Sequence, residues 1–314
     1  MGKNPEVSIV VISVGRLPLY SLVPAILEQE TDFGFEVLVI ANGPVRALDL
    51  PANGVRVHHE ESGKGIPYYR NVGTGLARGS VIVYIDDDEV LRDAHWLARL
   101  VEPIISGREK VTVGGAHIPQ GQGFLADLIS LLGYPGGGSL GWRNVWDVDP
   151  SGHTDKLCTC NCAIDKAALD SVGGFHEGLV LGASDLYLGE LLMENGVKIL
   201  LVDDATVEHE ARGDLPGFIR WQVNRGKSIY DLRRVRPLHE FSRGHVGGRM
   251  KRTWLILKHT FPGRQFIPMV GILLLEFACH AGGYALRVIE KGYTAGTGAR
   301  SANGLGGRAQ GGSK

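Results

Sequence analysis

The feature that most constrains this chain is the alternation of short apolar runs with helix-like stretches over its first 85 residues. Four runs of strand length, rich in β-branched residues, occupy 7–14, 35–40, 54–58 and 81–85. Between them, 17–29 and 68–78 carry apolar residues at helical spacing. This alternation predicts an α/β domain, a mostly parallel sheet with helices on both faces.

Composition narrows the class further. The chain has 314 residues, 44% hydrophobic and 21% charged, which excludes a wholly disordered protein and fits one large domain or two modest ones. Four cysteines are too few for a disulfide scaffold. The N-terminus lacks the apolar core and cleavage site of a secretory signal, so we expect the first part of the chain to be cytoplasmic.

Charge is distributed unevenly along the chain. The net charge of −1 conceals a basic block at 212–264, with thirteen Lys or Arg against three Asp or Glu. Such a block attracts phosphates of a nucleotide, a lipid head group or a nucleic acid, or it forms a solvated helical surface.

Beyond residue 90 the alternation loosens. A strand at 157–164, a helix at 186–195 and a strand at 197–202 are still predicted. We expect three regions: an α/β domain over 1–212, a basic and apolar helical extension over 213–290, and a disordered Gly-rich tail over 291–314.

The strongest chemical signal is the run Asp86-Asp87-Asp88-Glu89, directly after the predicted strand 81–85. Adjacent carboxylates repel one another, so a folded protein holds them together around a cation. Mg²⁺ and Mn²⁺ take oxygen ligands and bind substrate phosphates. Ligands in parallel sheets lie beyond the carboxyl ends of the strands, which favours a metal site here over a solvated acidic turn.

Four blocks then occur in a fixed order. They are Arg70-Asn71-Val72-Gly73 before the Asp triplet, Asn161 with Gly173-Gly174-Phe175-His176-Glu177, Ser184-Asp185-Leu186-Tyr187-Leu188, and Ala205-Thr206-Val207-Glu208-His209. Together they cover about residues 7–212, and the chain resembles the family 2 glycosyltransferases, which have the GT-A (nucleotide-diphospho-sugar transferase, Rossmann-like) fold.

The resemblance implies roles around the acids. Asp86 and Asp88 would bind the metal, Asp86 and Asp87 would also contact the nucleotide sugar, and His209 would touch the metal or the diphosphate. His209 is alternatively an ordinary surface residue beside Glu208.

The same resemblance implies a donor-binding set. It contains Ser13, Asn42, Arg70, Arg220 and Arg225. Asn42 stands where the family often has acids, so the nucleotide stays open. Arg220 and Arg225 lie in a segment that resembles the Arg/Trp-rich helix after the catalytic domain.

Asp185 would be the general base that deprotonates the acceptor, in a single displacement that inverts the sugar. A carboxylate at a helix start is alternatively an N-cap. Ser184 replaces the acid that usually precedes this Asp.

Two other patterns carry alternatives. Cys158, Cys160 and Cys162 would share one face of a strand, either as a zinc site or as small packed residues near the acceptor. The glycine-rich loop 133–141 lacks the features of a phosphate loop and would form a mobile lid, with Trp142 and Trp146 contacting the acceptor.

The segment 266–289 has the length of a membrane span but contains Glu276, His280 and Arg287. After the basic block, this predicts a helix packed into or onto the cytoplasmic leaflet. A buried helix or an oligomer interface is the alternative.

We therefore expect an inverting glycosyltransferase that uses a nucleotide-sugar donor and Mn²⁺ or Mg²⁺. Its acceptor would be a glycan, polysaccharide or lipid-linked intermediate at the inner face of the membrane. A nucleotidyltransferase is the first alternative, although Ser13-Val14-Gly15-Arg16 is a poor match to its Gly-rich signature. A non-catalytic binder of nucleic acid or anionic surfaces through 212–264 would leave the Asp triplet unused, and nucleic acid is not the expected partner.

Overall fold

The structure is a computed structural model that describes residues 5–43, 45, 50–51, 53–60, 63–236 and 250–303, with side chains up to residue 292. Parts of the predicted basic block (237–249) and tail (304–314) lie outside the described residues. The elements in chain order are β1 (Val7–Ser13), α1 (Leu19–Leu27), β2 (Phe35–Ala41), β3 (Val55–His59), α2 (Ile66–Leu76), β4 (Val81–Asp86), β5 (Glu89–Val90), α3 (Trp96–Ile105), β6 (Val111–His117), α4 (Phe124–Ser130), η2 (Gly138–Leu140), α5 (Trp142–Val145), β7 (His153–Thr154), β8 (Asn161–Asp165), α6 (Lys166–Ser171), α7 (Ser184–Glu194), β9 (Ile199–His209), α8 (Leu215–Val235) and α10 (Phe266–Asn303).

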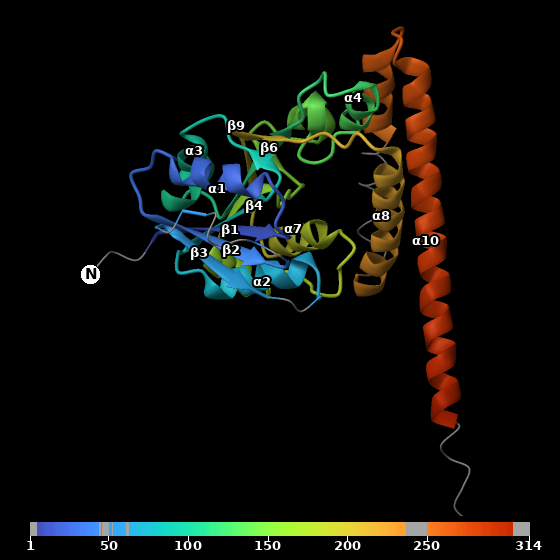
Figure 1. Ribbon diagram of the computed structural model, residues 1–314, viewed down its shortest axis with the longest axis horizontal. Helices are drawn as coiled ribbons and strands as arrows, with labels where there is room; N and C mark the ends of the chain where they lie inside the picture. The colour runs from blue at the N-terminus through green and yellow to red at the C-terminus, as the bar shows by residue number, and fades with distance from the viewer. Residues whose placement is uncertain are drawn as a thin grey trace, which may run out of the picture.

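One sheet organises residues 7–209, in the strand order β3-β2-β1-β4-β8-β6-β9-β5, with β7 beside β9 (Figure 1). The α/β prediction is confirmed, and β3, β2, β1 and β4 are parallel neighbours as expected. The second half is mixed, because β8 runs antiparallel to both β4 and β6. β8 starts at the carboxyl edge, where Asn161 lies opposite Ile85, so it can only run back down the sheet.

Both faces of the sheet are buried, as the near-continuous apolar strands require. Along β1, Val7, Ile9 and Val11 pack into the core under α1 and α3, whereas Val10 packs into the core under α2, α6 and α7. Alternate side chains thus enter opposite cores. The parallel pairing of β1 to β4 brings their carboxyl ends, with their polar residues, to one edge between the two helical layers.

The C-terminal region is a separate helical layer. α8, the helical residues 250–260 and α10 pack on α4 through a third apolar cluster that includes Leu132, Phe218, Ile256 and Met269 (Figure 1). The predicted boundary at 212/213 falls between β9 and α8. The backbone of α10 stays helical up to Asn303, through the first part of the tail that was predicted to be disordered, because each added residue extends an existing helix by one hydrogen bond.

Candidate active site

The carboxyl ends of β1, β2 and β4 bring the first predicted site residues together. Ser13 Oγ donates a 2.6 Å hydrogen bond to Asp87 Oδ2, and the backbone N–H of Asn42 donates to the Ser13 carbonyl at 2.8 Å. Asp87 is buried, and burial raises the pKa of its carboxyl although Ser13 and Arg16 oppose the rise. Ser13, Asn42 and Asp87 thus form one wall of the site.

Arg70 extends this wall from α2. It is buried, its Nη2 donates to Asp86 Oδ1 at 3.2 Å, and its guanidinium lies 5.4 Å from the ring centre of Phe175. Asn71 fixes Phe175, accepting from its N–H and donating to its carbonyl, both at 2.9 Å. Burial raises the pKa of Asp86 and Arg70 counteracts this, while 40% of the Asp86 side chain remains exposed. The carboxylate is therefore deep in the protein and still accessible.

The Asp88 side chain lies between those of Arg16 and His209. Arg16 Nη1 is 2.6 Å from Asp88 Oδ2, and His209 Nε2 is 3.5 Å from Asp88 Oδ1. His209 is buried, and its Nδ1 lies 2.7 Å from the carbonyl of Glu210. A carbonyl only accepts, so we assign the proton to Nδ1, which leaves Nε2 as the atom directed at Asp88.

Sheet pairing adds Glu89, a residue whose role the sequence did not predict. β5 pairs with the end of β9 and places Glu89 opposite His209. Ligand atoms of Asp88, Glu89 and His209 all lie within 4.8 Å of one another. The run of acids in the sequence could have indicated a metal-binding role for Glu89. Its pairing with a strand 120 residues later could not be predicted from the sequence.

Glu89 is almost completely buried, and apart from the weak thiol donor of Cys160 neither carboxylate oxygen has a partner among the described residues. Burial, together with the charges of Asp86 and Asp88, raises its pKa well above the ordinary value. An unpartnered buried carboxylate in a cluster of acids is the donor set expected where a cation binds.

Arg212 is a second residue that sequence reasoning did not single out from the basic block. Its guanidinium lies 4.7 Å from the ring centre of Trp221. Packing against the protein lowers its pKa, while attraction to Asp88 raises it and repulsion by Arg16 lowers it. Arg16, Arg70 and Arg212 therefore surround the acids with positive charge.

The two residues of α8 that were predicted to bind the sugar donor, Arg220 and Arg225, differ in their surroundings. Arg225 stacks on Tyr134, at 4.0 Å, and faces Trp221, and its Nε is buried with no partner in the described part of the chain. Arg212 and Arg225 both lie against the ring of Trp221, at 4.7 and 5.5 Å from its centre, and the two like charges repel each other. Arg220 is exposed, and within the described residues it makes no hydrogen bond or ion pair with the acids.

Asp185 is the second residue of α7 and is half-buried. The N-cap is Ala183, so the N-cap alternative for Asp185 is wrong; its Oδ1 accepts from the N–H of Leu186 at 2.8 Å. Among the described residues Ala183 is the one non-glycine residue with positive φ, at 62°. No contact between Asp185 and the acids is described.

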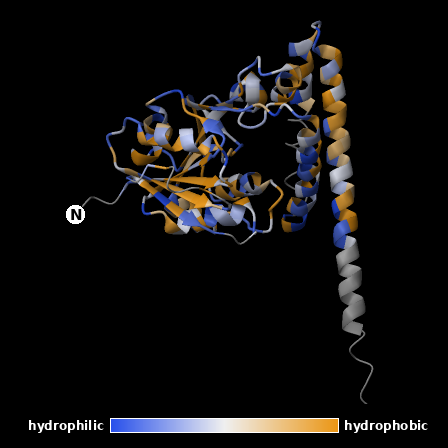
Figure 2. Cartoon of the chain, viewed as in Figure 1, coloured by the Kyte–Doolittle hydropathy of each residue, from blue (hydrophilic) through white to orange (hydrophobic). Residues whose placement is uncertain are grey.

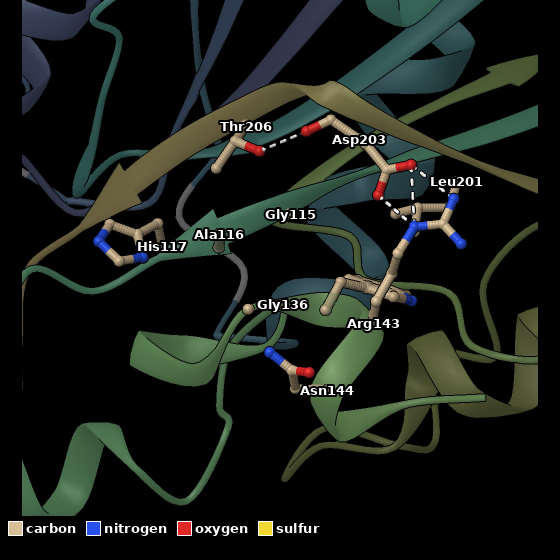
Figure 3. A pocket seen from close by; sticks show the side chains of 11 residues that line it. Gly115, Ala116, His117, Gly136, Arg143, Asn144, Leu201, Asp203 and Thr206 are labelled. Carbon is tan, nitrogen blue, oxygen red and sulfur yellow. Dashed lines mark hydrogen bonds and ion pairs between the residues drawn. The ribbon is translucent and has the colours of Figure 1, made fainter. Parts of the chain in front are cut away.

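A cavity in the structure is lined by none of the acids or arginines described above. It has a volume of about 310 Å³ between β6, β9 and α5, and Figure 3 shows the Arg143–Asp203 ion pair on its wall. Trp142 lines it but is only 5% exposed, so it is mainly a core residue. The loop 133–141 is packed rather than lid-like: a Cβ on Gly136 would lie 2.4 Å from the backbone nitrogen of Ala116.

The three clustered cysteines do not share a face. β8 begins only at Asn161, so Cys158 and Cys160 belong to the preceding turn, with their sulfurs 3.1 Å apart. Cys160 and Cys162 pack into opposite cores. Within the described residues the three do not form a metal-binding group, which removes the geometric basis of the zinc alternative.

Comparison with known proteins identifies the family. The model of glycosyl transferase family 2 matches residues 8–162. A glucosyl-dolichyl phosphate glucuronosyltransferase from Haloferax volcanii is 27% identical over 122 residues, which are 36% of this chain and 39% of that relative. The alignment thus spans less than half the length of the curated relative.

Two solved structures share the fold. The mannosyltransferase PcManGT from Pyrobaculum calidifontis, in complex with GDP-Man and Mn²⁺, has a TM-score of 0.55 at 15% identity, over 92% of this chain and 87% of that one. GalNAc-T7 with UDP, GalNAc and Mn²⁺ has a TM-score of 0.51 at 18% identity, over 79% of this chain and 54% of that one. The GT-A fold is confirmed. The family favours the glycosyltransferase prediction over a nucleotidyltransferase or a non-catalytic binder. The match over residues 8–162, within a chain of this fold, identifies that part of the protein as a family 2 glycosyltransferase domain.

Proposed function

We propose that this protein transfers a sugar from a nucleoside-diphosphate donor to an acceptor hydroxyl or phosphate oxygen by a metal-assisted single displacement that inverts the anomeric carbon. The observation that carries the proposal is the acid cluster Asp86–Asp88 with Glu89 and His209 at the carboxyl edge of the sheet, surrounded by arginines. The acids and His209 would hold a cation, and the arginines would bind the departing diphosphate.

The residues present fit a divalent cation. Asp88, Glu89 and His209 would hold it, because their ligand atoms are mutually close and the Glu89 oxygens lack strong donors. Asp86 lies beside them with an accessible carboxylate. When bound, Mn²⁺ or Mg²⁺ would neutralise charge on the departing diphosphate. The imidazole ligand makes Mn²⁺ our first choice over Mg²⁺, and both solved relatives named above contain Mn²⁺.

The chain's own cations complete the donor site. Arg16 pairs with Asp88, the charge of Arg212 is attracted to Asp88, and Arg225 lies on α8 near Arg212. Charge-assisted contacts from arginines are well suited to phosphate oxygens. Ser13 and Asn42, at the ends of β1 and β2, would contact the nucleoside.

Asp185 would take the proton from the acceptor. The left-handed backbone at Ala183 fixes the start of α7, and strained backbone is often retained where it positions a functional group. A general base in position contributes about 10²–10⁴-fold to rate.

We further propose that the acceptor is lipid-linked and that the protein works at the inner face of a membrane. The relative from Haloferax volcanii is named for a dolichyl phosphate substrate. The described residues also contain one helix, Phe266–Gly292, long and apolar enough to cross a bilayer.

The test is hydrolysis of nucleotide sugars, with water as acceptor, in the presence and absence of Mn²⁺. We expect metal-dependent turnover that Asp88→Ala abolishes. Asp185→Asn should lower turnover by about 10²–10⁴-fold and leave the Mn²⁺-dependent thermal shift by the donor intact. Asp32→Asn, an exposed acid on a loop, is the control. Metal-independent turnover, or full activity of either variant, would contradict the proposal.

A further inference from the structure

The outer face of α10 is apolar along the whole predicted membrane segment. Between 266 and 289 every exposed residue of this helix is apolar or small. Among the large apolar residues of this helix, the most exposed are Ile267 (81%), Phe277 (70%), Ile289 (67%) and Leu274 (65%). Figure 2 shows this helix as a predominantly hydrophobic column on the outside of the molecule.

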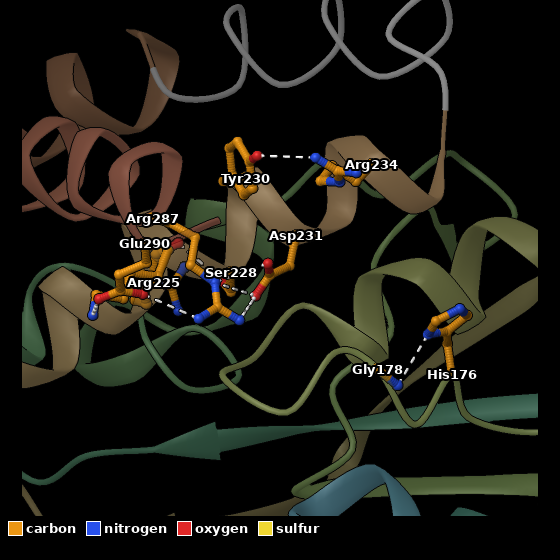
Figure 4. A network of polar contacts seen from close by, with 10 residues as sticks. His176, Gly178, Arg225, Ser228, Tyr230, Asp231, Arg234, Arg287 and Glu290 are labelled. Atoms are coloured by element: carbon orange, nitrogen blue, oxygen red, sulfur yellow. Dashed lines mark hydrogen bonds and ion pairs between the residues drawn. The ribbon is translucent and has the colours of Figure 1, made fainter. Parts of the chain in front are cut away.

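The two charged residues between 266 and 289, Glu276 and Arg287, face the protein instead. Glu276 forms a buried ion pair with Arg252, at 2.9 Å, and each side chain is 4% exposed. Arg287 binds Asp231 of α8 through two nitrogens, at 2.9–3.1 Å (Figure 4). A helix on the surface of a water-soluble protein has the opposite arrangement, with its polar face outward. The exposed face of α10 is therefore better suited to an apolar partner than to water.

We propose that the outer face of α10 lies on an anionic lipid bilayer, parallel to its surface and half-immersed, without crossing it. The inference rests on the proposed function for its choice of a membrane as the partner, and it specifies the contact surface and its orientation.

Length alone would allow a span, because Phe266–Gly292 has 27 residues and a mean hydropathy of 1.6. α8, however, lies directly against α10: a Cβ on Gly226 would be 2.2 Å from the His280 carbonyl oxygen, and one on Gly283 would be 2.1 Å from that of Val223. α8 carries Arg220, Arg233 and Arg234 on its exposed surface.

An upright α10 would carry these arginines into the hydrocarbon, at a cost of about 2.5–3.5 kcal/mol each on insertion scales. A helix lying in the interface places its apolar face about 5–10 Å deep and leaves α8 on the aqueous side. The preceding segment adds the groups expected at such an interface, with exposed Trp254 and Phe261 beside exposed Lys258 and Arg264.

The orientation is tested by depth measurement in the full chain. Ile267, Leu274, Ala281 and Val288 are spaced by seven residues and drift only about 20° per step around the helix. Each is replaced in turn by cysteine and spin-labelled, in a background with Cys158→Ser. Collision with oxygen and with a water-soluble nickel complex gives the depth in vesicles of phosphatidylcholine and phosphatidylglycerol. Four similar, shallow depths are expected. A profile deepest in the middle would show a span and overturn the proposal.

Affinity is tested by vesicle co-sedimentation. Leu274→Gln with Phe277→Gln should weaken binding by about tenfold or more, since the loss of buried apolar area at two side chains exceeds one decade of affinity. Ile105→Gln, at an exposed apolar residue on α3, is the matched control. Added salt and pure phosphatidylcholine should both weaken binding.

Failure of this inference is distinguishable from failure of the proposed function. Mn²⁺-dependent donor hydrolysis without vesicles should be the same in the wild type and in the Leu274→Gln, Phe277→Gln variant. Binding equal in the control and the variant, or a lipid-independent dimer lost in that variant, would overturn the membrane inference and leave the hydrolysis result standing.

Discussion

The α/β region and the C-terminal helical region place their polar groups in opposite ways. In the first, apolar strands fill two cores, and the acids and arginines gather at the strand ends. In the second, the ion pairs Arg252–Glu276 and Arg287–Asp231 lie between helices, while isoleucine, leucine and phenylalanine face outward. The two regions are therefore suited to different surroundings, the first to a charged substrate in water and the second, as we propose, to lipid.

The largest stability effect should come from breaking the internal ion pair of the helical region. Glu276→Leu leaves the Arg252 guanidinium buried without its carboxylate, and we expect a loss of about 3–5 kcal/mol in unfolding free energy. Adding Arg252→Met should restore most of it. Denaturant unfolding followed by circular dichroism measures both.

The matching change in the exposed pair Arg108–Glu102 of the α/β region, Glu102→Leu, should cost within about 1 kcal/mol. Equal losses for the two Glu→Leu changes would remove the claimed difference between the regions.

One glycine of α8 and one of α10 test the distinction between the inner and outer faces of these helices. Gly226→Ala places a Cβ against the backbone of α10 and should destabilise by about 1–3 kcal/mol. Gly271→Ala, on the outer face where an added Cβ would meet no atom within 4 Å, should stabilise by roughly 0.5–1 kcal/mol. Thermal unfolding of the two variants should therefore shift in opposite directions, and shifts of the same sign would contradict the packing described.

In the α/β region strain is concentrated before Asp185. Ala183→Gly removes the steric cost of the left-handed backbone and should stabilise by about 1 kcal/mol. Ala285→Gly, in an exposed turn of α10, should instead destabilise by about 0.5–1 kcal/mol. A stabilised Ala183→Gly protein with reduced donor hydrolysis would show that the strain positions Asp185.

The last prediction concerns the pH dependence of stability in the metal-free protein. Because burial and neighbouring acids raise the pKa of Glu89 well above 4.5, its contribution to stability is full below pH 4.5 and is lost as the pH rises through the raised value. The melting temperature of the wild type should therefore fall more steeply than that of Glu89→Gln as the pH rises. Added Mn²⁺ should make the fall in melting temperature with pH as shallow in the wild type as in Glu89→Gln. Parallel curves would mean that Glu89 is not in an acid cluster.

Much of the α/β region was predictable because local patterns agree with its tertiary structure. β1, β2, β3 and β4 begin within a residue of the predicted runs, since buried parallel strands read as continuous apolar segments. The acid run after β4 was readable for the same reason. The direction of β8 and the turn at Cys158–Cys160 were not, because antiparallel insertion leaves no periodic signal in one strand.

Three features could be read from the amino-acid sequence alone: the strand–helix order, the Asp86–Asp88 cluster at a strand end and the apolar character of 266–289. All three follow from residue type and short-range spacing. Three contacts depend on the folded chain: Glu89 with His209, Arg212 with the acids, and Glu276 and Arg287 of α10 with Arg252 and Asp231. These contacts join residues far apart in the chain, and their partners are chosen by sheet register and helix rotation, which no local pattern records.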